Sequence, residues 1–453
     1  MTAGSWLLNA LFRKRIACDT RRHLAAITTE QSQLSRRNVS ALLRRLAGEP
    51  GPRVFLGQTD WGQAVKIPLP LLVTAYGIIT GGTGSGKTMS AMPLVEAILA
   101  AFETDMSFGV LDAKGELFER TLYLLARTLE MLSPAAAERL RERLVIIDLA
   151  SLDPVTSFNV AAPWSGADLD YFATCRMETL QELFPSGDGL SLRGGSILKH
   201  VVKLLAEQGV PFSCFDQVLS SDDFRSRLIS ASKDDELRTY FRVHFPSEGR
   251  ATIAAVRARL NATLLSSTSL RLALSGIHAP DFRALQDNGA IVLVNCAGPN
   301  IPRATARTLQ GLLLSDIRQG VFTRRNQRPY LWLCDEAQNF SRSKYLRENM
   351  LDLLTMSRSF GSHCMFLTQN LSTAVQDSDI LETLHTNIRW SLTLRGTAKD
   401  AAFLEPALPT SGRRQKPRAN PYAPAEFYSP REERALLLQD VAHLSDRVGW
   451  LWL

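Results

Sequence analysis

Apolar runs alternate with helix-like segments along residues 54–159 of this 453-residue chain. The runs YGIIT, SFGVLD and LVIID are rich in β-branched and aliphatic residues, and segments with apolar residues at helical spacing lie between them. Strands that alternate with helices predict a parallel, doubly wound α/β sheet. The segment before them, RVFLGQTDWGQAVKIPL, contains Gly57 and the turn residues Asp60, Trp61 and Gly62, and it predicts a β-hairpin.

The alternation stops within residues 160–285, where helical patterns such as GSILKHVVKLLAEQG and SEGRATIAAVRARLNATLL dominate. In the second pattern the apolar residues recur at helical spacing, which predicts a buried face. That face would consist of Ile253, Val256, Leu260 and Leu264. We therefore predict an all-α domain over this range.

Strand-like runs return in residues 286–404, as AIVLVNCAG, PYLWLC, HCMFLT and NIRWSLTL. The all-α domain would thus interrupt one α/β domain, whose two parts are residues 54–159 and 286–404. A stretch rich in proline and arginine, residues 405–430, predicts an exposed loop. Residues 431–453 form a C-terminal segment, and residues 1–53 a basic helical arm.

The sequence GGTGSGKT, directly after the first buried run, has the pattern of a phosphate-binding loop. Glycines let consecutive N–H groups turn toward an anion, and the helix that follows aims its positive dipole end at the same phosphates. Lys87 would contact the β and γ phosphates of ATP, and the Thr88 hydroxyl would bind Mg²⁺. A flexible Gly/Ser linker, the alternative, would explain neither residue. We expect the nucleotide to be bound by Gly81, Gly82, Thr83, Gly84, Ser85, Gly86, Lys87 and Thr88.

Asp335 and Glu336 directly follow the apolar run LWLC. In a nucleotide-hydrolysing site, such an aspartate orients the water shell of Mg²⁺, and the glutamate takes a proton from the attacking water. An apolar strand that ends in Asp-Glu is a weak signal alone. It becomes strong on a strand that neighbours the phosphate-loop strand, which is the arrangement we expect here. We predict Asp335 as a metal-site residue beside Thr88, and Glu336 as the catalytic base.

Two further residues are candidates for the same catalytic site. Gln369 ends the run HCMFLT and could hydrogen-bond the γ-phosphate or the attacking water. The alternative for Gln369 is an ordinary polar residue at a strand end. Arg358 follows a helical segment and precedes the helix stop signal Gly361, so it could act on a phosphate or simply interact with the helix C-terminus. Arg395, on the next strand-like run, is the second candidate for a phosphate contact.

The net charge of +7 lies in the N-terminal arm, because residues 1–53 hold ten basic and three acidic residues. A solvated helical arm is one interpretation of this excess. A contact with nucleic acid or with an anionic membrane is the other. The same choice applies to Arg250 and Arg257 of the helical region, which are most simply solvated, with a DNA or partner contact as the alternative.

The composition is that of a globular protein, with 45% hydrophobic and 21% charged residues. No apolar run reaches the length of about 18 residues that a membrane-spanning helix requires. The six cysteines are widely spaced and form no CxxC pair. This spacing predicts reduced, buried thiols in a cytosol.

The motifs GGTGSGKT, DAKGELF, SFNVA, LWLCDEAQNF, SRSFG and FLTQN occur in an order that resembles type IV coupling proteins of the TraG/TraD kind. These proteins belong to the FtsK/HerA class of hexameric motors, and the resemblance covers roughly residues 54 to 400. It implies a RecA-like ATPase core and an all-α domain that helps to select a relaxase and DNA cargo. It also implies that Arg358 is an arginine finger that acts on a neighbouring subunit. The implied ATP and Mg²⁺ site consists of Lys87, Thr88, Asp335, Glu336 and Gln369.

Members of this family usually carry transmembrane helices before the ATPase core, whereas this chain has a short basic arm. We expect a cytoplasmic bacterial protein that docks at the inner membrane through a separate partner, or a soluble relative with a different task. The first functional hypothesis is a homohexameric motor that feeds DNA, with or without attached protein, into a conjugation machine. The alternatives are a nucleotide-gated platform that recruits cargo without pumping, and a HerA/FtsK-type DNA motor outside conjugation.

Overall fold

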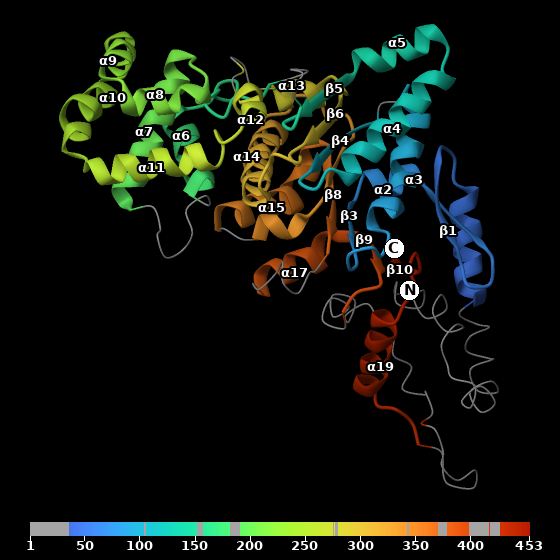
Figure 1. The fold of residues 1–453 in the computed structure, drawn as a ribbon. Coiled ribbons are helices and arrows are strands. Elements are labelled where there is room, and N and C mark those ends of the chain that lie inside the picture. The colour runs from blue at the N-terminus through green and yellow to red at the C-terminus, as the bar shows by residue number, and fades with distance from the viewer. Residues whose placement is uncertain are drawn as a thin grey trace. The chain divides into compact units, whose positions relative to one another are not determined.

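The computed structural model of the chain has two compact units, each built from segments that are far apart in the sequence (Figure 1). The first unit contains residues 1–104, 336–338 and 363–453, and the second contains residues 105–335 and 339–362. The structure describes residues 36–103, 106–151, 157–181, 191–274, 276, 280–341, 344–369, 378–397, 416 and 426–453.

The main sheet has eight strands in the order β10-β9-β3-β8-β7-β4-β6-β5. The pairs β3–β8, β3–β9, β4–β6, β4–β7 and β5–β6 are parallel, and only the edge pair β10–β9 among the described pairings of this sheet is antiparallel. The predicted doubly wound, mainly parallel α/β fold is therefore confirmed. The expectation that the strand before Asp335 neighbours the phosphate-loop strand is wrong, because β8 lies between β3 and β7. Because parallel strands are joined by crossover connections, strands that neighbour each other in the sheet need not follow each other in the sequence.

The first unit carries the phosphate-loop strand and both termini of the described chain. Its main-sheet strands β3 and β8 are buried along their whole length. A separate antiparallel hairpin, β1–β2, confirms the predicted hairpin. The elements are β1 (Arg53–Gln58), β2 (Ala64–Pro68), α2 (Leu69–Val73), β3 (Tyr76–Thr80), α3 (Lys87–Ala100), β8 (Ser362–Thr368), α17 (Ser378–Asn387), β9 (Ile388–Leu394), α19 (Pro430–Ala442) and β10 (Gly449–Trp452).

Only the end of the predicted basic arm falls within the described residues, where residues 36–48 are helical. Val39, Leu43 and Leu46 on this helix are buried, so its apolar face is packed. The doublet Arg44–Arg45 is exposed, as the solvated interpretation expects. Residues 1–35 and most of the predicted loop 405–430 lie outside the described residues.

The second unit contributes the other half of the sheet and the helices that pack on it. Helix α4 follows Gly115 and has Glu116 and Glu119 in its first turn, where negative charge favours the helix dipole. Helix α5 begins with Pro134 after the Ser133 cap. The elements are β4 (Ser107–Asp112), α4 (Glu116–Met131), α5 (Pro134–Glu142), β5 (Leu144–Asp148), β6 (Ile291–Asn295), α14 (Arg303–Phe322), β7 (Tyr330–Cys334), the 3₁₀ helix η6 (Ala337–Ser341), which spans the boundary between the units, α15 (Lys344–Met356) and the 3₁₀ helix η7 (Ser357–Phe360).

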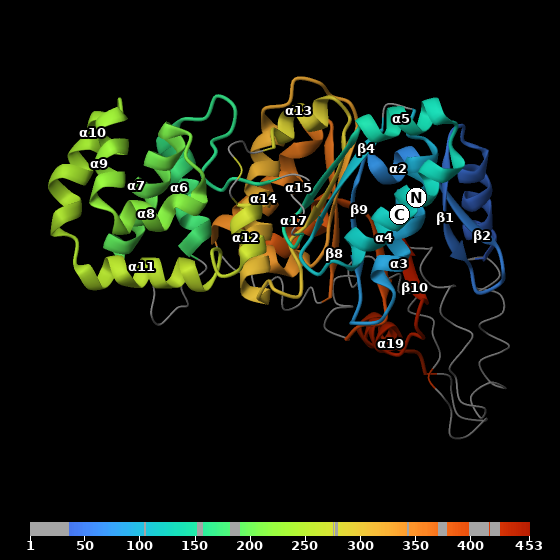
Figure 2. The same ribbon diagram turned by 45° about the horizontal axis from the view of Figure 1, so that its top comes forward.

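The regular elements in the described part of residues 160–285 are all helices, without a strand, as predicted (Figure 2). Val256, Leu260 and Leu264 are buried, whereas Ile253 is only half-buried, which corrects one position of the predicted face. The helices are α6 (Leu169–Leu180), α7 (Leu192–Gln208), η3 (Phe212–Cys214), α8 (Phe215–Ser220), α9 (Asp222–Ala231), α10 (Asp235–Thr239), the π-helix η4 (Tyr240–His244), η5 (Phe245–Ser247), α11 (Arg250–Ala262), α12 (Thr268–Ala273) and α13 (Phe282–Asp287).

A buried ion pair joins the first helix of this region to the long helix α14. Arg176 on α6 is fully buried, and its guanidinium lies 2.6 Å from the carboxylate of Asp316 on α14. The Arg176 Nε also donates to the carbonyl oxygen of Val160, at 2.9 Å. Because an unpaired buried charge is costly, removing either partner would destabilise this junction.

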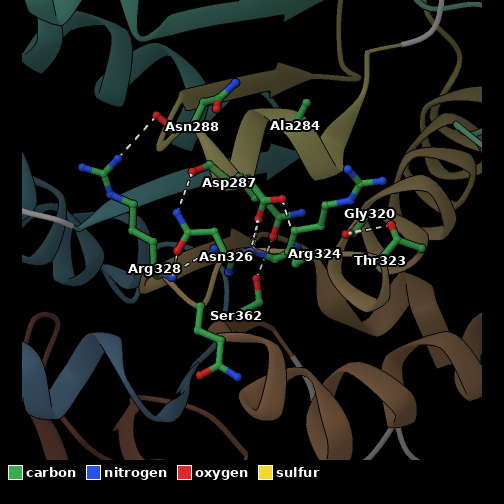
Figure 3. A network of polar contacts seen from close by, with 12 residues as sticks. Ala284, Asp287, Asn288, Gly320, Thr323, Arg324, Asn326, Arg328 and Ser362 are labelled. Carbon is green, nitrogen blue, oxygen red and sulfur yellow. Dashed lines mark hydrogen bonds and ion pairs between the residues drawn. The ribbon is translucent and has the colours of Figure 1, made fainter.

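A polar network fixes the loop between α14 and β7 within the second unit (Figure 3). The Asp287 carboxylate accepts hydrogen bonds from the Arg324 Nε at 3.2 Å and from the backbone N–H of Asn326 at 3.2 Å. The Asn326 side chain in turn accepts from the backbone N–H of Arg328, at 3.0 Å. These contacts satisfy backbone groups that a loop would otherwise leave unpaired.

The predicted burial of the cysteine thiols is confirmed for most of those that the structure describes. The five cysteines of the described residues are free thiols, and all but Cys214 are buried. Among the helices that the structure describes, none is both long enough and apolar enough to span a membrane.

Candidate nucleotide-binding site

The phosphate-loop motif lies where the sequence predicts it, between the end of β3 and the start of α3. Gly86 is the N-cap residue of α3 and has a left-handed φ of 101°, and Gly84 has a φ of 76°. These conformations favour glycine because they place a Cβ atom in a strained position. The loop therefore presents its N–H groups at the N-terminus of a helix, the usual arrangement for binding phosphate.

Contacts with neighbouring strands leave no room for a side chain at the start of the loop. A Cβ atom on Gly81 would lie 2.6 Å from the Ser85 Oγ and 2.8 Å from the Leu394 Cβ. The N–H of Gly82 donates to the carbonyl oxygen of Arg395, which follows β9, at 2.7 Å. The backbone of the loop is thus held in place by its own unit.

Lys87 and Thr88, the first two residues of α3, are buried, with 8% and 9% of their surface exposed. The Lys87 Nζ donates to the carbonyl oxygens of Gly81 and Gly82, at 2.8 and 3.1 Å. The ammonium therefore lies against the loop that carries it. The Ser85 Oγ is buried and has no hydrogen-bond partner among the described residues. An unsatisfied hydroxyl and a glycine cradle beside a lysine fit a bound phosphate chain.

Glu336 lies in the same unit as the loop and has an unusual backbone. Its φ is 53°, one of two positive values among the described non-glycine residues. Its carboxylate accepts hydrogen bonds from the side-chain amides of Gln369 and Gln338. Strained residues held by their surroundings are common at functional sites. The carboxylate is fixed in one orientation by two amide donors.

Gln369 links this carboxylate to the phosphate loop. Its Oε1 accepts a hydrogen bond from the Thr83 Oγ1 at 3.0 Å, while its amide nitrogen donates to Glu336. The Gln338 Oε1 accepts from the Thr368 Oγ1 at 2.9 Å, which orients the second amide. The structure therefore brings Thr83, Glu336 and Gln369 together, as the prediction of a shared site requires.

Asp335 ends β7 and belongs to the second unit. It is buried, with 3% of its surface exposed. Its backbone N–H donates to the Leu111 carbonyl at 3.0 Å, and its own carbonyl accepts from the Gln310 Nε2 at 2.6 Å. These contacts fix the backbone at the carboxyl end of the strand, where ligands of parallel sheets bind.

Arg358 also belongs to the second unit and has an exposed side chain. It lies in the 3₁₀ turn after α15, and its carbonyl accepts from the N–H of Gly361 at 3.0 Å. Gly361 has a left-handed φ of 68°, as the predicted stop signal requires. Arg395, the second candidate, lies 2.9 Å from the Asp446 carboxylate of its own unit and is therefore an ion-paired residue.

Two residues near the loop were not identified from the sequence. Gln338 is one, and its only signal was an amide side chain two residues after Glu336. Arg447, which precedes β10, is the other. It has a φ of 62°, and its N–H donates to the Ser85 carbonyl at 3.3 Å. No local motif marks it, because its position depends on the pairing of β10 with β9.

The acidic residues that end β4 and β5 accept hydrogen bonds from the backbone of the loops that follow these strands. The Asp112 carboxylate accepts from the backbone N–H groups of Lys114 at 2.7 Å and Phe118 at 2.9 Å. Burial nevertheless raises the pKa of Asp112 above its usual range. The Asp148 carboxylate accepts from the Ala150 N–H at 3.0 Å and from the Asn295 Nδ2 at 2.9 Å.

Solved structures match most of this chain. A structure of the bacterial conjugative coupling protein TrwBdeltaN70 is 15% identical over 91% of this chain and 88% of that chain, with a TM-score of 0.54. The chain has the RecA-like fold of TrwB. The plasmid coupling protein TrwB in complex with ADP and Mg²⁺ gives a TM-score of 0.55, also at 15% identity, over 91% of this chain and 89% of that chain.

The structure of a second protein matches as well. The structure of VirB4 of Thermoanaerobacter pseudethanolicus is 14% identical over 79% of this chain and 88% of that chain, with a TM-score of 0.51. No protein-family model matches the sequence, and no curated protein does. At these identities the likeness to TrwB and VirB4 is one of fold.

Proposed function

We propose that this chain hydrolyses ATP and uses the energy to move DNA, with or without attached protein, into a conjugative type IV secretion machine. The observation that carries the proposal is the chain of contacts from Thr83 of the phosphate loop through Gln369 to the carboxylate of Glu336. A protein that only binds nucleotide needs the loop, whereas a hydrolase also needs a positioned base. The fold likeness to TrwB supports the assignment to coupling proteins.

In this proposal the loop N–H groups and Lys87 bind the phosphates, and Thr88 and Asp335 hold the metal ion. When bound, Mg²⁺ would neutralise charge on the phosphates and ATP would supply the phosphoryl group. Glu336 holds the proton that leaves the attacking water. Gln369 orients Glu336 through its amide nitrogen, and its amide oxygen accepts a hydrogen bond from Thr83 of the loop.

Arg358 completes the site from a neighbouring subunit of a homohexamer. Its side chain is exposed, and an arginine finger stabilises charge on the transferring phosphoryl group only in the assembled ring. Arg395, which forms an ion pair with Asp446, is the second candidate.

The proposed partners are DNA, a relaxase or other protein cargo, and channel or membrane proteins of the secretion machine. The protein would work in the bacterial cytoplasm, docked at the inner membrane through those partners. TrwB is a conjugative coupling protein, and the fold likeness to it supports this assignment.

The test is ATP hydrolysis by the purified full chain with and without DNA. We expect Mg²⁺-dependent turnover that DNA stimulates. Lys87→Ala should reduce it by about two or more orders of magnitude, as the loss of a group that stabilises transition-state charge does. Lys66→Ala, which removes an exposed lysine of β2 in the same unit, is the matched control and should leave turnover unchanged. A recruitment platform would bind nucleotide and show no DNA-stimulated turnover.

A further inference from the structure

The all-α region contains a cavity that shares no lining residue with the nucleotide site. Its volume is about 690 Å³, and it is lined by residues of α7, α10, the π-helix η4 and the turn that follows. A π-helix is rare in proteins and occurs frequently at functional sites. The cavity is large enough for a long amino-acid side chain.

The wall of the cavity contains a stacked pair of rings. The imidazole of His200 and the ring of Tyr240 are parallel within 5°, with their centroids 3.6 Å apart. Burial lowers the pKa of His200, which favours the neutral form of its ring. The π-helix places Tyr240 at this position, one turn after Glu236 of α10.

Tyr240 is only 5% exposed, and its hydroxyl is buried. This hydroxyl has no hydrogen-bond partner among the described residues. The Ser196 hydroxyl lies close enough to lower the pKa of Tyr240, but burial dominates and raises it to about 12. Tyr240 therefore keeps its proton. An unsatisfied buried hydroxyl that lines a cavity indicates a missing polar partner.

Glu248 supplies a second unsatisfied group. Its Oε2 is buried and has no partner among the described residues, although the side chain lines the cavity. Asp235 and Glu236 line the same cavity, and Arg193 is the basic residue of the lining. Asp235 is paired with Arg238. The cavity thus carries an excess of negative charge beside an aromatic wall.

We propose that this cavity binds the guanidinium of an arginine side chain from a protein partner. A carboxylate oxygen without a donor requires N–H groups, and a guanidinium has five of them in a planar fork. His200 and Tyr240 line the same cavity as Glu248, so a group bound there lies beside both a carboxylate and aromatic rings. A free polyamine shares part of this chemistry, as an organic cation with N–H donors, and the experiment separates the two sources.

The experiment uses the full chain with histidine labelled at ¹³Cε1, observed by NMR. The signals of His200 and His244, assigned from His200→Asn and His244→Asn, are followed during titration with the peptide N-acetyl-Gly-Arg-Gly-amide. We expect a saturable shift of the His200 signal. The matched peptide with citrulline, which keeps the shape and loses the charge, should bind about tenfold more weakly or worse, the scale of one charged hydrogen bond.

Variants locate the site. Glu248→Gln should weaken the arginine peptide about tenfold, as the loss of one charge-assisted hydrogen bond predicts. Asp223→Asn, at an exposed carboxylate of α9 outside the cavity, should bind as the wild type does, and so should Lys87→Ala. The thermal midpoint of each variant is measured first, so that a change in folding is not mistaken for a change in binding.

Three results would overturn the proposal. The first is the absence of a saturable shift with the arginine peptide. The second is equal binding of the citrulline peptide or of the Glu248→Gln variant. The third is saturable binding of spermidine in place of the arginine peptide, which would assign the cavity to a free polyamine. A failure to detect ATP hydrolysis would not count against arginine binding, since the cavity shares no residue with the nucleotide site.

Discussion

The carboxylate of Glu336 accepts a hydrogen bond from the side-chain amide of Gln369, whose oxygen accepts from Thr83 of the phosphate loop. This contact joins the proposed base to the loop within one compact unit. Glu336 reaches it with a left-handed φ of 53°. That conformation costs a residue with a Cβ atom about 1–2 kcal/mol, so the surrounding contacts have to hold it in place.

Glu336→Gln should bind ATP as the wild type does and hydrolyse it about two or more orders of magnitude more slowly, the usual scale for a general base. The substitution keeps the shape of the side chain and removes only the proton acceptor. Turnover is measured under saturating ATP, and binding is measured separately with a fluorescent analogue. Normal turnover in this variant would make Glu336 a structural residue.

Arg358→Ala should be inactive alone and should regain activity when mixed with Glu336→Gln. In a mixed ring, some interfaces pair an intact base with an intact arginine from the neighbour. Arginine fingers contribute about 10³–10⁵ in rate, so even a small fraction of such interfaces is measurable. Arg358→Lys should also be impaired, because lysine lacks the planar fork.

The control for this mixture is the assembly itself, because subunits have to exchange before activity can return. Mixed rings are demonstrated with two affinity tags. If mixed rings form and no activity returns at any ratio, Arg358 acts within its own subunit or only at the end of α15.

Gly361→Ala should lower the thermal midpoint by more than Gly209→Ala does. Both glycines have a left-handed φ, of 68° and 63°. A Cβ atom on Gly361 would lie 2.4 Å from the Gln327 carbonyl oxygen, whereas one on Gly209 would meet nothing within 4 Å. The Gly209 variant therefore measures the backbone strain, about 1 kcal/mol or a few degrees. Equal thermal midpoints of the two variants in calorimetry would contradict the close contact between Gly361 and Gln327.

Asp216→Asn should destabilise the all-α region at neutral pH by about 1 kcal/mol, the upper end for a partly exposed ion pair. The Arg257 guanidinium donates to both oxygens of Asp216, at 2.8 and 3.1 Å, and lowers the pKa of that carboxyl. A lowered folded-state pKa gives stability that is present above the unfolded value of 3.8 and is lost as pH falls through the folded value. The difference from wild type should therefore shrink at acidic pH.

Thermal midpoints of wild type and Asp216→Asn between neutral and acidic pH check this sign. Asp223→Asn, at an exposed position of α9, is the control and should follow the wild type at every pH. A gap between Asp216→Asn and wild type that widened on acidification would contradict the ion-pair explanation.

The sequence predicted the features that depend on local pattern. The loop of residues 81–88, the strand that ends at Asp335 and the αL stop at Gly361 are each encoded by neighbouring residues. The pairing of Arg257 with Asp216 was not predicted, because the two lie on different helices. It adds an ion pair to a side chain that the sequence described only as solvated or partner-binding.

Features set by long-range pairing could not be predicted either. The insertion of β8 between β3 and β7 depends on crossover connections, and the place of Arg447 beside Ser85 depends on the antiparallel pairing of β10. The half-burial of Ile253 has the same kind of cause, since helical spacing defines a face but not how far its neighbours cover it.

The most direct test of the motor is displacement of streptavidin from biotinylated DNA by the full chain, on duplex and on single-stranded substrates. We expect displacement that requires ATP and Mg²⁺ and that Glu336→Gln, with ATP bound, does not produce. The comparison is made with enough free biotin to prevent rebinding. ATP hydrolysis that DNA stimulates, without displacement from either substrate, would contradict the motor and favour a nucleotide-gated recruitment platform.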